Sequence, residues 1–186
     1  MKFTLLALAG FALVTATSAN AHTAVLEYSG YSGNSNFYSP PVAETTNFGN
    51  QWPDTATQRS IARAIVAINK KDYGAAKTIL AKIRPGQFFG QRSLAGIKFL
   101  TGLAYTGTND LVSARSYFSE AEQVDRSFLD ASVALSIINW HLGDRAASNA
   151  VLTSLVARQE GCRSKCSLSA EFDRVVPIVQ KVVARK

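Results

Sequence analysis

Cysteine and histidine are rare in this chain of 186 residues, which contains two of each. Structural zinc sites need a close set of such ligands, so this composition disfavours one. The acidic residues are scattered, and neither a G-x-S-x-G nucleophile elbow nor a glycine-rich phosphate loop occurs. We therefore predict a protein that is not an enzyme and that carries no cofactor.

Long apolar runs are also missing from the interior of the sequence. No internal stretch reaches the roughly 20 residues that a membrane-spanning helix needs. Charged residues make up 18% of the chain and hydrophobic residues 47%, the proportions of an ordinary globular domain. The composition predicts one folded domain without a membrane span.

The first 21 residues have a different character. Lys2 gives a positive start, an apolar segment follows over residues 3–14, and Ala19-Asn20-Ala21 fits the small-residue cleavage pattern. These features predict a secretory signal peptide at 1–21 and an exported protein, periplasmic or secreted, of a bacterial cell envelope. An uncleaved anchor is the alternative, although the apolar segment is short for a span.

Export bears on the expected redox state of Cys162 and Cys166. In an oxidising compartment, two isolated cysteines this close in sequence are expected to form a disulfide that closes a small loop. A thiol-redox role is the alternative, because Arg163 and Lys165 would favour the thiolate form. Thioredoxin-like sites have a shorter spacing, so we favour the structural disulfide.

Cleavage after Ala21 would leave His22 as the N-terminal residue. An N-terminal histidine can bind copper through its amine and imidazole when a second histidine, here His141, is near. This arrangement resembles the histidine brace of copper oxygenases and copper chaperones, which are built on sheets, whereas this chain has helical periodicity. Copper handling is therefore an alternative function, and we expect no metal site.

Residues 22–54 are rich in Ser, Gly, Asn and Pro, with aromatic residues spread among them and no helical period. Such a segment cannot form a core of its own. We predict a disordered arm. It either remains a loose linker or docks its aromatic side chains onto the folded part of the chain or onto a partner.

The remaining sequence has apolar residues at helical spacing between turn signals. Asp72, Asp110 and Asp144 stand where helices are expected to begin, and aspartate is a favourable N-cap. Pro177 is expected to kink or split the last helix. The predicted helices span residues 55–70, 73–83, 91–105, 111–123, 127–142, 145–159 and 168–185.

The clearest motif lies in residues 98–126. Gly102, Tyr105, Ala114 and Phe118 follow the pattern W-x2-L-G-x2-Y, then A-x3-F, over about 34 residues. The segment thus resembles a tetratricopeptide repeat (TPR), in which small residues let two antiparallel helices cross closely while aromatic residues fill the space beside the crossing. The family's Trp, Leu and Pro positions are occupied here by Lys98, Thr101 and Arg126.

The pattern recurs on both sides of this segment. A shift of about 34 residues takes Gly102 to Ser136 and Ala114 to Ser148, so small residues return at the same places. An earlier unit, ending near residue 83, is offset by a longer spacing that requires an insertion at 84–90. Three units are about the minimum for a solenoid.

The resemblance implies an all-α fold: a short right-handed α-solenoid of antiparallel helix pairs over residues 55–159. Residues 160–186 would supply the disulfide loop and a C-terminal capping helix, because repeat arrays need a terminal element that covers the exposed face of the last unit.

In TPR proteins the first helix of each pair lines a concave surface that receives a peptide. The resemblance therefore implies a partner-binding groove and predicts a non-catalytic scaffold for a protein or peptide partner. The family's carboxylate clamp uses Lys, Asn and Arg, which apolar residues replace here. The candidate groove residues are Ile61, Ile65, Phe99, Leu103, Val133, Ile137 and Trp140.

An exposed apolar groove of this size is expected to be covered. Three occupants are candidates: a foreign peptide, the aromatic arm of the chain itself, or a second copy in a homo-oligomer. Alternatively, a short array curls enough to make these residues part of its internal core.

The formal net charge is +7, and basic residues gather near the C-terminal end. They suit either an anionic surface or a solvated face without a partner. Export argues against nucleic acid as a partner. The basic residues in question are Arg158, Arg163, Lys165, Arg174, Lys181, Arg185 and Lys186.

Overall fold

Seven helices and no strand occur over residues 55–84, 90–162 and 166–184, the part of the chain that the computed structural model describes. The prediction of an all-α fold is confirmed for these residues. The predicted signal peptide and arm lie outside them. The helices are α2 (Thr55–Asn69), α3 (Tyr73–Leu80), α4 (Gln91–Gly107), α5 (Leu111–Val124), α6 (Leu129–His141), α7 (Arg145–Cys162) and α8 (Ser169–Val183).

All seven predicted helices are found, and two boundaries differ by about one turn. Helix α3 ends at Leu80, and α7 continues to Cys162. From the sequence, Pro177 is expected to kink or split the last helix; a split is wrong, because α8 runs through Pro177 without interruption. Pro177 is exposed, so water can bond to the helix carbonyl that lacks an N–H partner there.

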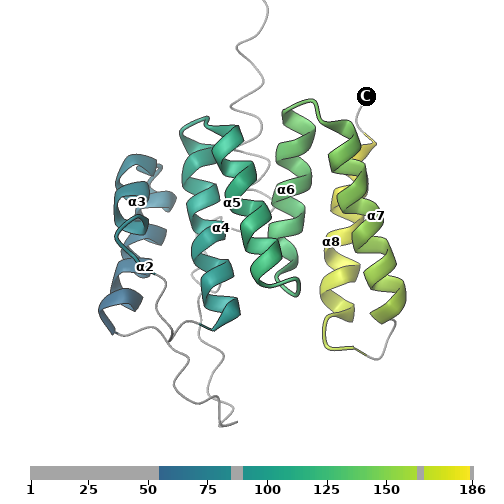
Figure 1. Ribbon diagram of the computed structural model, residues 1–186, viewed down its shortest axis with the longest axis horizontal. Coiled ribbons are helices and arrows are strands. Elements are labelled where there is room, and N and C mark those ends of the chain that lie inside the picture. The colour runs from purple at the N-terminus through teal and green to yellow at the C-terminus, as the bar shows by residue number, and fades with distance from the viewer. Residues whose placement is uncertain (1–54, 85–89, 163–165, 185–186) are drawn as a thin grey trace, which may run out of the picture.

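The helices pack in the order of the sequence, side by side (Figure 1). Helices α2 and α3, α4 and α5, and α6 and α7 form pairs, and each pair packs against the next. Helix α8 packs on both α6 and α7. None of the described helices combines the length and the apolar character needed to cross a membrane.

The same turn joins the two helices of each pair. Lys71, Asn109 and Gly143 have positive φ angles of 61°, 61° and 80°. In each case this residue donates its N–H to the carbonyl oxygen three positions earlier. The following aspartate donates its N–H to the carbonyl oxygen five positions earlier, with N–O distances of 2.9, 3.0 and 2.9 Å for Asp72, Asp110 and Asp144. These two bonds define a Schellman motif, which satisfies the last carbonyls of a helix.

Each of these turns also starts the next helix. The carboxylates of Asp72, Asp110 and Asp144 accept hydrogen bonds from the backbone N–H three residues on, at 3.0, 3.0 and 2.9 Å. The three predicted N-caps are therefore confirmed. Hydrogen bonds from the backbone and side chain of Ser113 hold the pKa of Asp110 below its ordinary value.

The paired helices cross where the side chains are small. A Cβ atom added to Gly102 would lie 2.5 Å from Cε1 of Phe118, so only glycine fits there without movement of the ring. In the next pair, Ser136 and Ser148 are buried with their hydroxyl oxygens 2.9 Å apart. Helix α4 can therefore approach α5 closely over the Phe118 ring.

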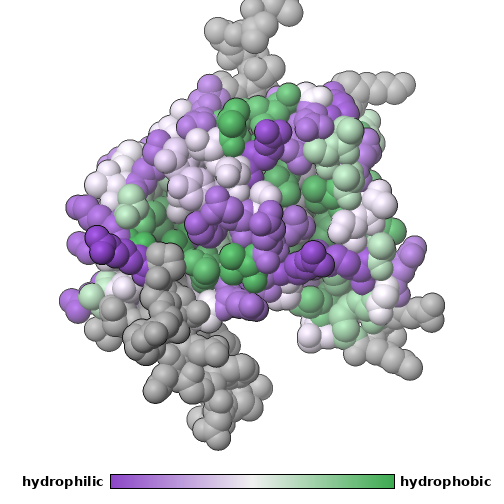
Figure 2. Space-filling view, in the orientation of Figure 1, coloured by the Kyte–Doolittle hydropathy of each residue, from purple (hydrophilic) through white to green (hydrophobic). Residues whose placement is uncertain are grey.

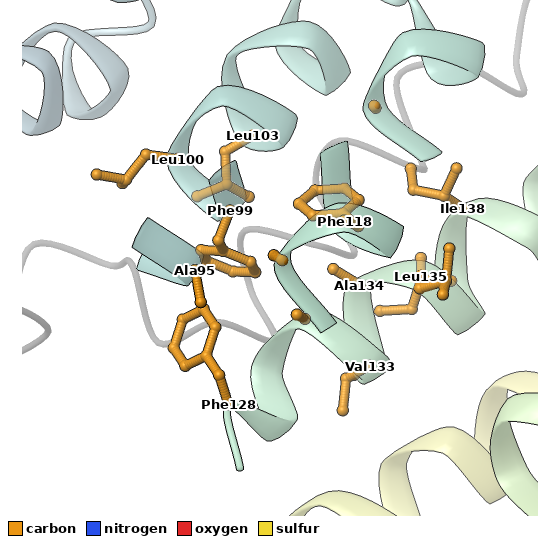
Figure 3. Packing of buried hydrophobic residues seen from close by; sticks show 14 of the residues in the cluster. Ala95, Phe99, Leu100, Leu103, Phe118, Phe128, Val133, Ala134, Leu135 and Ile138 are labelled. Atoms are coloured by element: carbon orange, nitrogen blue, oxygen red, sulfur yellow. The ribbon is translucent and has the colours of Figure 1, made fainter. Parts of the chain in front are cut away.

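Aromatic rings fill the space beside this crossing. The ring centroid of Phe99 lies 5.5 Å from that of Phe118 and 5.2 Å from that of Phe128, which meets it edge-on. Figure 3 shows Phe99 between these two rings, with Leu103 above it and residues of α6 beyond Phe118. The core is thus continuous from α4 through α5 to α6.

We expect Gly102→Ala to lower the free energy of unfolding by about 1–3 kcal/mol, because the new methyl group must displace the Phe118 ring. Thermal or urea unfolding followed by circular dichroism measures this. The matched control is Gly161→Ala in α7, where an added Cβ meets nothing within 4 Å. The control should gain up to about 1 kcal/mol from helix propensity. Equal stability of Gly102→Ala and the wild type would contradict the close crossing.

The positive φ angles in the turns give a second prediction, on stability. Gly143→Ala should cost about 1 kcal/mol, because its left-handed backbone disfavours any side chain, whereas Lys71→Gly should stabilise by several tenths of a kcal/mol. Gly74→Ala is the control, since Gly74 lies inside α3 without a positive φ. Unfolding midpoints that change in the same direction for Gly143→Ala and Lys71→Gly would argue against the shared turn geometry.

Candidate partner-binding face

The seven predicted groove residues lie on α2, α4 and α6, the first helices of the three pairs. The side of these helices that carries them is called the first-helix face below. Only Ile65 and Trp140 are half-buried, and both pack against the core. The other five residues are at most 2% exposed, namely Ile61, Phe99, Leu103, Val133 and Ile137.

This burial limits what a partner can reach. In the conformation described, a ligand has direct access to Ile65 at one end of the first-helix face and to Trp140 at the other. The five residues between them belong to the buried core, where Phe99 packs against the rings of Phe118 and Phe128. A groove formed by all seven residues therefore stays a prediction.

At the Trp140 end of the first-helix face, Arg145 and His141 both contact the Trp140 ring. The guanidinium carbon of Arg145 lies 4.4 Å from the centroid of the Trp140 ring, and the His141 ring meets it edge-on at 4.9 Å. Arginine over an indole face is a favourable cation–π contact. The start of α7 therefore holds the Trp140 side chain in place.

The opposite end of α6 carries an ion-pair network. Asp130, whose side chain is 7% exposed, lies 3.1 Å from Nη2 of Arg174 on α8. Arg174 also reaches Glu171, at 3.8 Å, one turn earlier on the same helix. A buried carboxylate needs such a partner. The network ties α8 to the first turn of α6.

The environment of Glu171 disfavours its charged form. Burial is the largest cause that raises its pKa, and the nearby Asp130 carboxylate raises it further, while Arg92 and Arg174 act in the opposite direction. Acids with raised pKa values are common at catalytic sites. Here both carboxylates lie within ion-pair distance of Arg174. This geometry is that of a structural network.

Sequence reasoning missed a cluster that joins α3, α4 and α5. Tyr105 and Tyr117 stack with ring centroids 5.2 Å apart, and Nζ of Lys77 lies 4.0 Å from the Tyr105 ring. Lys98 approaches Tyr117 and pairs with Glu120 at 2.6 Å. The available signal was the spacing of Lys98 and Tyr105, which places them two turns apart on the same side of α4.

The cysteine pair lies at the junction of α7 and α8. The Cα atoms of Cys162 and Cys166 are 5.3 Å apart, a disulfide separation, which agrees with the predicted bridge. His141 lies beside Trp140, and His22 is outside the described residues. Within the described part of the chain, no group of three or more His, Cys, Asp or Glu side chains could hold a metal ion.

Two of the basic residues near the C-terminal end serve packing. Arg158 donates to the carbonyl of Arg126 and lies over the Phe172 ring at 5.4 Å, and burial lowers its pKa. Arg174 is in the network with Asp130. Four others lie outside the described residues: Arg163, Lys165, Arg185 and Lys186.

Figure 2 shows the side of the molecule on which α7 lies in front of α8. Hydrophobic side chains visible there form separate patches between hydrophilic ones (Figure 2). Among the residues that the structure describes, the large apolar side chains that are clearly exposed are Val66 on α2 and Val112 on α5. Isolated apolar side chains of this kind are normal on a protein surface.

Comparisons of this chain with protein-family models, curated proteins and solved structures found no match.

Glu171 is expected to make the free energy of unfolding depend on pH. Because its folded-state pKa lies above the ordinary 4.5, the wild type should lose stability as pH rises through the window between these values. Glu171→Gln should therefore be more stable than the wild type at pH 7, and this advantage should disappear in acid. Thermal unfolding between pH 4 and pH 7 measures it.

The control for this prediction is Glu160→Gln, which changes an exposed acid on α7. It should leave the pH profile unchanged. A wild-type chain that gains stability relative to Glu171→Gln as pH rises would show that the arginines outweigh burial at this site.

Proposed function

We propose that this protein is an exported, non-catalytic scaffold of TPR-like helix pairs that holds a protein or peptide partner on its first-helix face. The array would be a short right-handed α-solenoid, with α8 as its terminal cap.

The recurrence of one turn carries this proposal. The three Schellman turns are each followed by an aspartate N-cap, and they are centred on Lys71, Asn109 and Gly143. Asn109 and Gly143 are 34 residues apart, as are Gly102 and Ser136, whereas Lys71 and Asn109 are 38 residues apart, the longer spacing expected for the first unit. A chain that repeats one helix pair at about 34 residues is typical of an interaction array.

The polar groups of the described residues support a binding role over a catalytic one. Asp72, Asp110 and Asp144 are bound to helix N-termini, and Asp130 and Glu171 are within ion-pair distance of Arg174. A catalytic centre needs groups positioned for a substrate, and these carboxylates are committed to the fold.

Export is supported by two separate features. Residues 1–21 have the composition of a signal peptide. Cys162 and Cys166 lie at disulfide distance, and disulfides persist in oxidising compartments outside the cytosol.

The chemistry of the first-helix face favours an apolar ligand. Its accessible ends are Ile65 and the Trp140 side chain with Arg145 beside it. A few buried residues, often Trp, Tyr or Arg, contribute most of the binding energy at an interface, and they tend to contact similar residues of the partner. We therefore expect the partner segment to present apolar or aromatic side chains, and not the acidic C-terminus that a carboxylate clamp would bind.

Peptides selected from a displayed random library against the full mature chain test this. Ile65→Asp should weaken binding of a selected peptide at least tenfold, about 1.4 kcal/mol, because it places a charge on the face. The dissociation constant is measured by calorimetric titration. Trp140→Ala should weaken binding to a similar extent.

The matched control for Ile65→Asp is Val66→Asp on the same helix, since the Val66 side chain is 50% exposed and adjacent in sequence. This control should bind like the wild type. Equal loss in Ile65→Asp and Val66→Asp, or no loss in either, would place the binding surface elsewhere. Circular dichroism checks that each variant remains helical.

A further inference from the structure

The positive charge of residues 55–186 is concentrated in the first helix pair. Residues 55–84 contain seven basic residues and one acidic residue, whereas residues 85–186 contain 12 basic and nine acidic residues. The acidic residue, Asp72, accepts the hydrogen bond that caps α3. The pair stands at one end of the row of helices (Figure 1). Its basic residues are Arg59, Arg63, Lys70, Lys71, Lys77, Lys82 and Arg84.

Basic residues of the later helices have acidic partners. Four of them lie 2.6–3.8 Å from a carboxylate oxygen: Arg92, Lys98, Arg115 and Arg174. Within the described part of the chain, five basic residues of the first pair lie in no ion pair, namely Arg63, Lys70, Lys71, Lys82 and Arg84. The positive charge of the first pair is therefore largely uncompensated by the fold.

Three of these cations share one side of α2 with an exposed valine. Lys70 continues the helix by one residue, because its N–H donates to the Val66 carbonyl oxygen at 3.0 Å. At about 100° per residue, all four side chains lie within about 60° of one another, over roughly 16 Å of the helix. All four are exposed. This side of α2 is called the basic face below: Arg59, Arg63, Val66 and Lys70.

The basic face is the outer side of the first pair. The buried residues of α2 lie about 140–200° around the helix from Arg59, on the side that packs against the core. They include Ile61, Ala64 and Ile68. Further exposed cations lie near both ends of the pair, with Lys71 in the turn after α2 and with Lys82 and Arg84 after α3.

We infer that the basic face binds an anionic lipid surface. Cations close to such a surface are attracted by its negative potential, and their contributions accumulate. The outer side of a single helix is convex, so it suits a broad partner better than a narrow chain that needs a recess. A lipid surface offers phosphate groups at any position, and the long basic side chains can adjust to them.

Val66 favours a lipid surface over a soluble polyanion. A single exposed apolar side chain is common on proteins, but Val66, which is 50% exposed, stands between Arg63 and Lys70 on the same side of the helix. Helices that lie on membranes place apolar side chains at the boundary of the acyl chains while their cations contact the headgroups. A sulfated or carboxylated chain would interact with the cations alone.

This inference does not depend on the proposed peptide partner. Val66 and Ile65 lie about 100° apart around α2, so the basic face and the first-helix face can be changed separately. Lipid binding is measured on purified protein without added peptide, and peptide binding is measured without lipid. Failure of one proposal therefore leaves the other standing.

Flotation of the full mature chain with lipid vesicles tests the inference. The anionic vesicles contain about 30% phosphatidylglycerol in phosphatidylcholine, and the neutral vesicles contain phosphatidylcholine alone. The chain should bind the anionic vesicles about tenfold or more tightly than the neutral ones. Added salt should weaken this binding, because it screens the charges. Equal binding to both kinds of vesicle, or binding to neither, would overturn the inference.

The double variant Arg63→Gln with Lys70→Gln locates the contact. It should weaken binding to anionic vesicles by about tenfold, because two cations next to the lipid are lost. The matched control is Arg126→Gln with Lys181→Gln, which removes one exposed arginine and one exposed lysine outside the first pair. The control should bind like the wild type. An equal loss in both double variants would attribute the attraction to net charge and contradict binding through α2.

Val66→Ser separates a lipid surface from a soluble polyanion. It should weaken binding to anionic vesicles by about threefold, because less apolar area is buried, and should leave binding to dextran sulfate unchanged. Val112→Ser is the control, since Val112 is exposed on α5, and it should change neither. Vesicle binding that is unchanged in Val66→Ser would overturn the inference in favour of a polyanion site. Circular dichroism checks that each variant remains helical.

Discussion

Close approach of paired helices is the constraint on which this structure depends. Helix α4 can lie against α5 only because Gly102 leaves room for the Phe118 ring, where an added Cβ would lie 2.5 Å from the ring. The next pair meets the same requirement with Ser136 and Ser148, whose hydroxyl groups bond to each other. Wider crossings would leave gaps in the core, and such gaps are costly because protein interiors are close-packed.

Polar contacts then determine where the second helix of each pair starts and how α8 is attached. A left-handed residue followed by an aspartate cap reverses the chain between the helices of each pair, as at Asn109 and Asp110. Such turns satisfy backbone groups that would otherwise be exposed at helix ends. At the other end of α6, the contact between Asp130 and Arg174 joins α8 to the core. The acidic groups of the described residues thus serve mainly the architecture.

The first-helix face links this architecture to the proposed function. Apolar residues at helical spacing on α4 and α6 build a surface that must be covered, because exposed apolar area of this extent is unfavourable in water. In the function proposed above, a partner segment packs on the accessible ends of this surface, at Ile65 and Trp140.

The sequence by itself determined the seven helices of the described residues and the three aspartate N-caps, because periodicity, capping aspartates and Gly143 act within a few residues of the chain. It also indicated the small-residue crossing, since Gly102 and Phe118 occupy the small and aromatic positions of a repeat pattern in which two helices cross closely. Only the tertiary structure decided that α8 continues through Pro177, that Tyr105 stacks on Tyr117, and that Phe99 and Ile137 are buried. These outcomes depend on which segments pack against a helix face, and a local pattern shows that a face is apolar without showing what covers it.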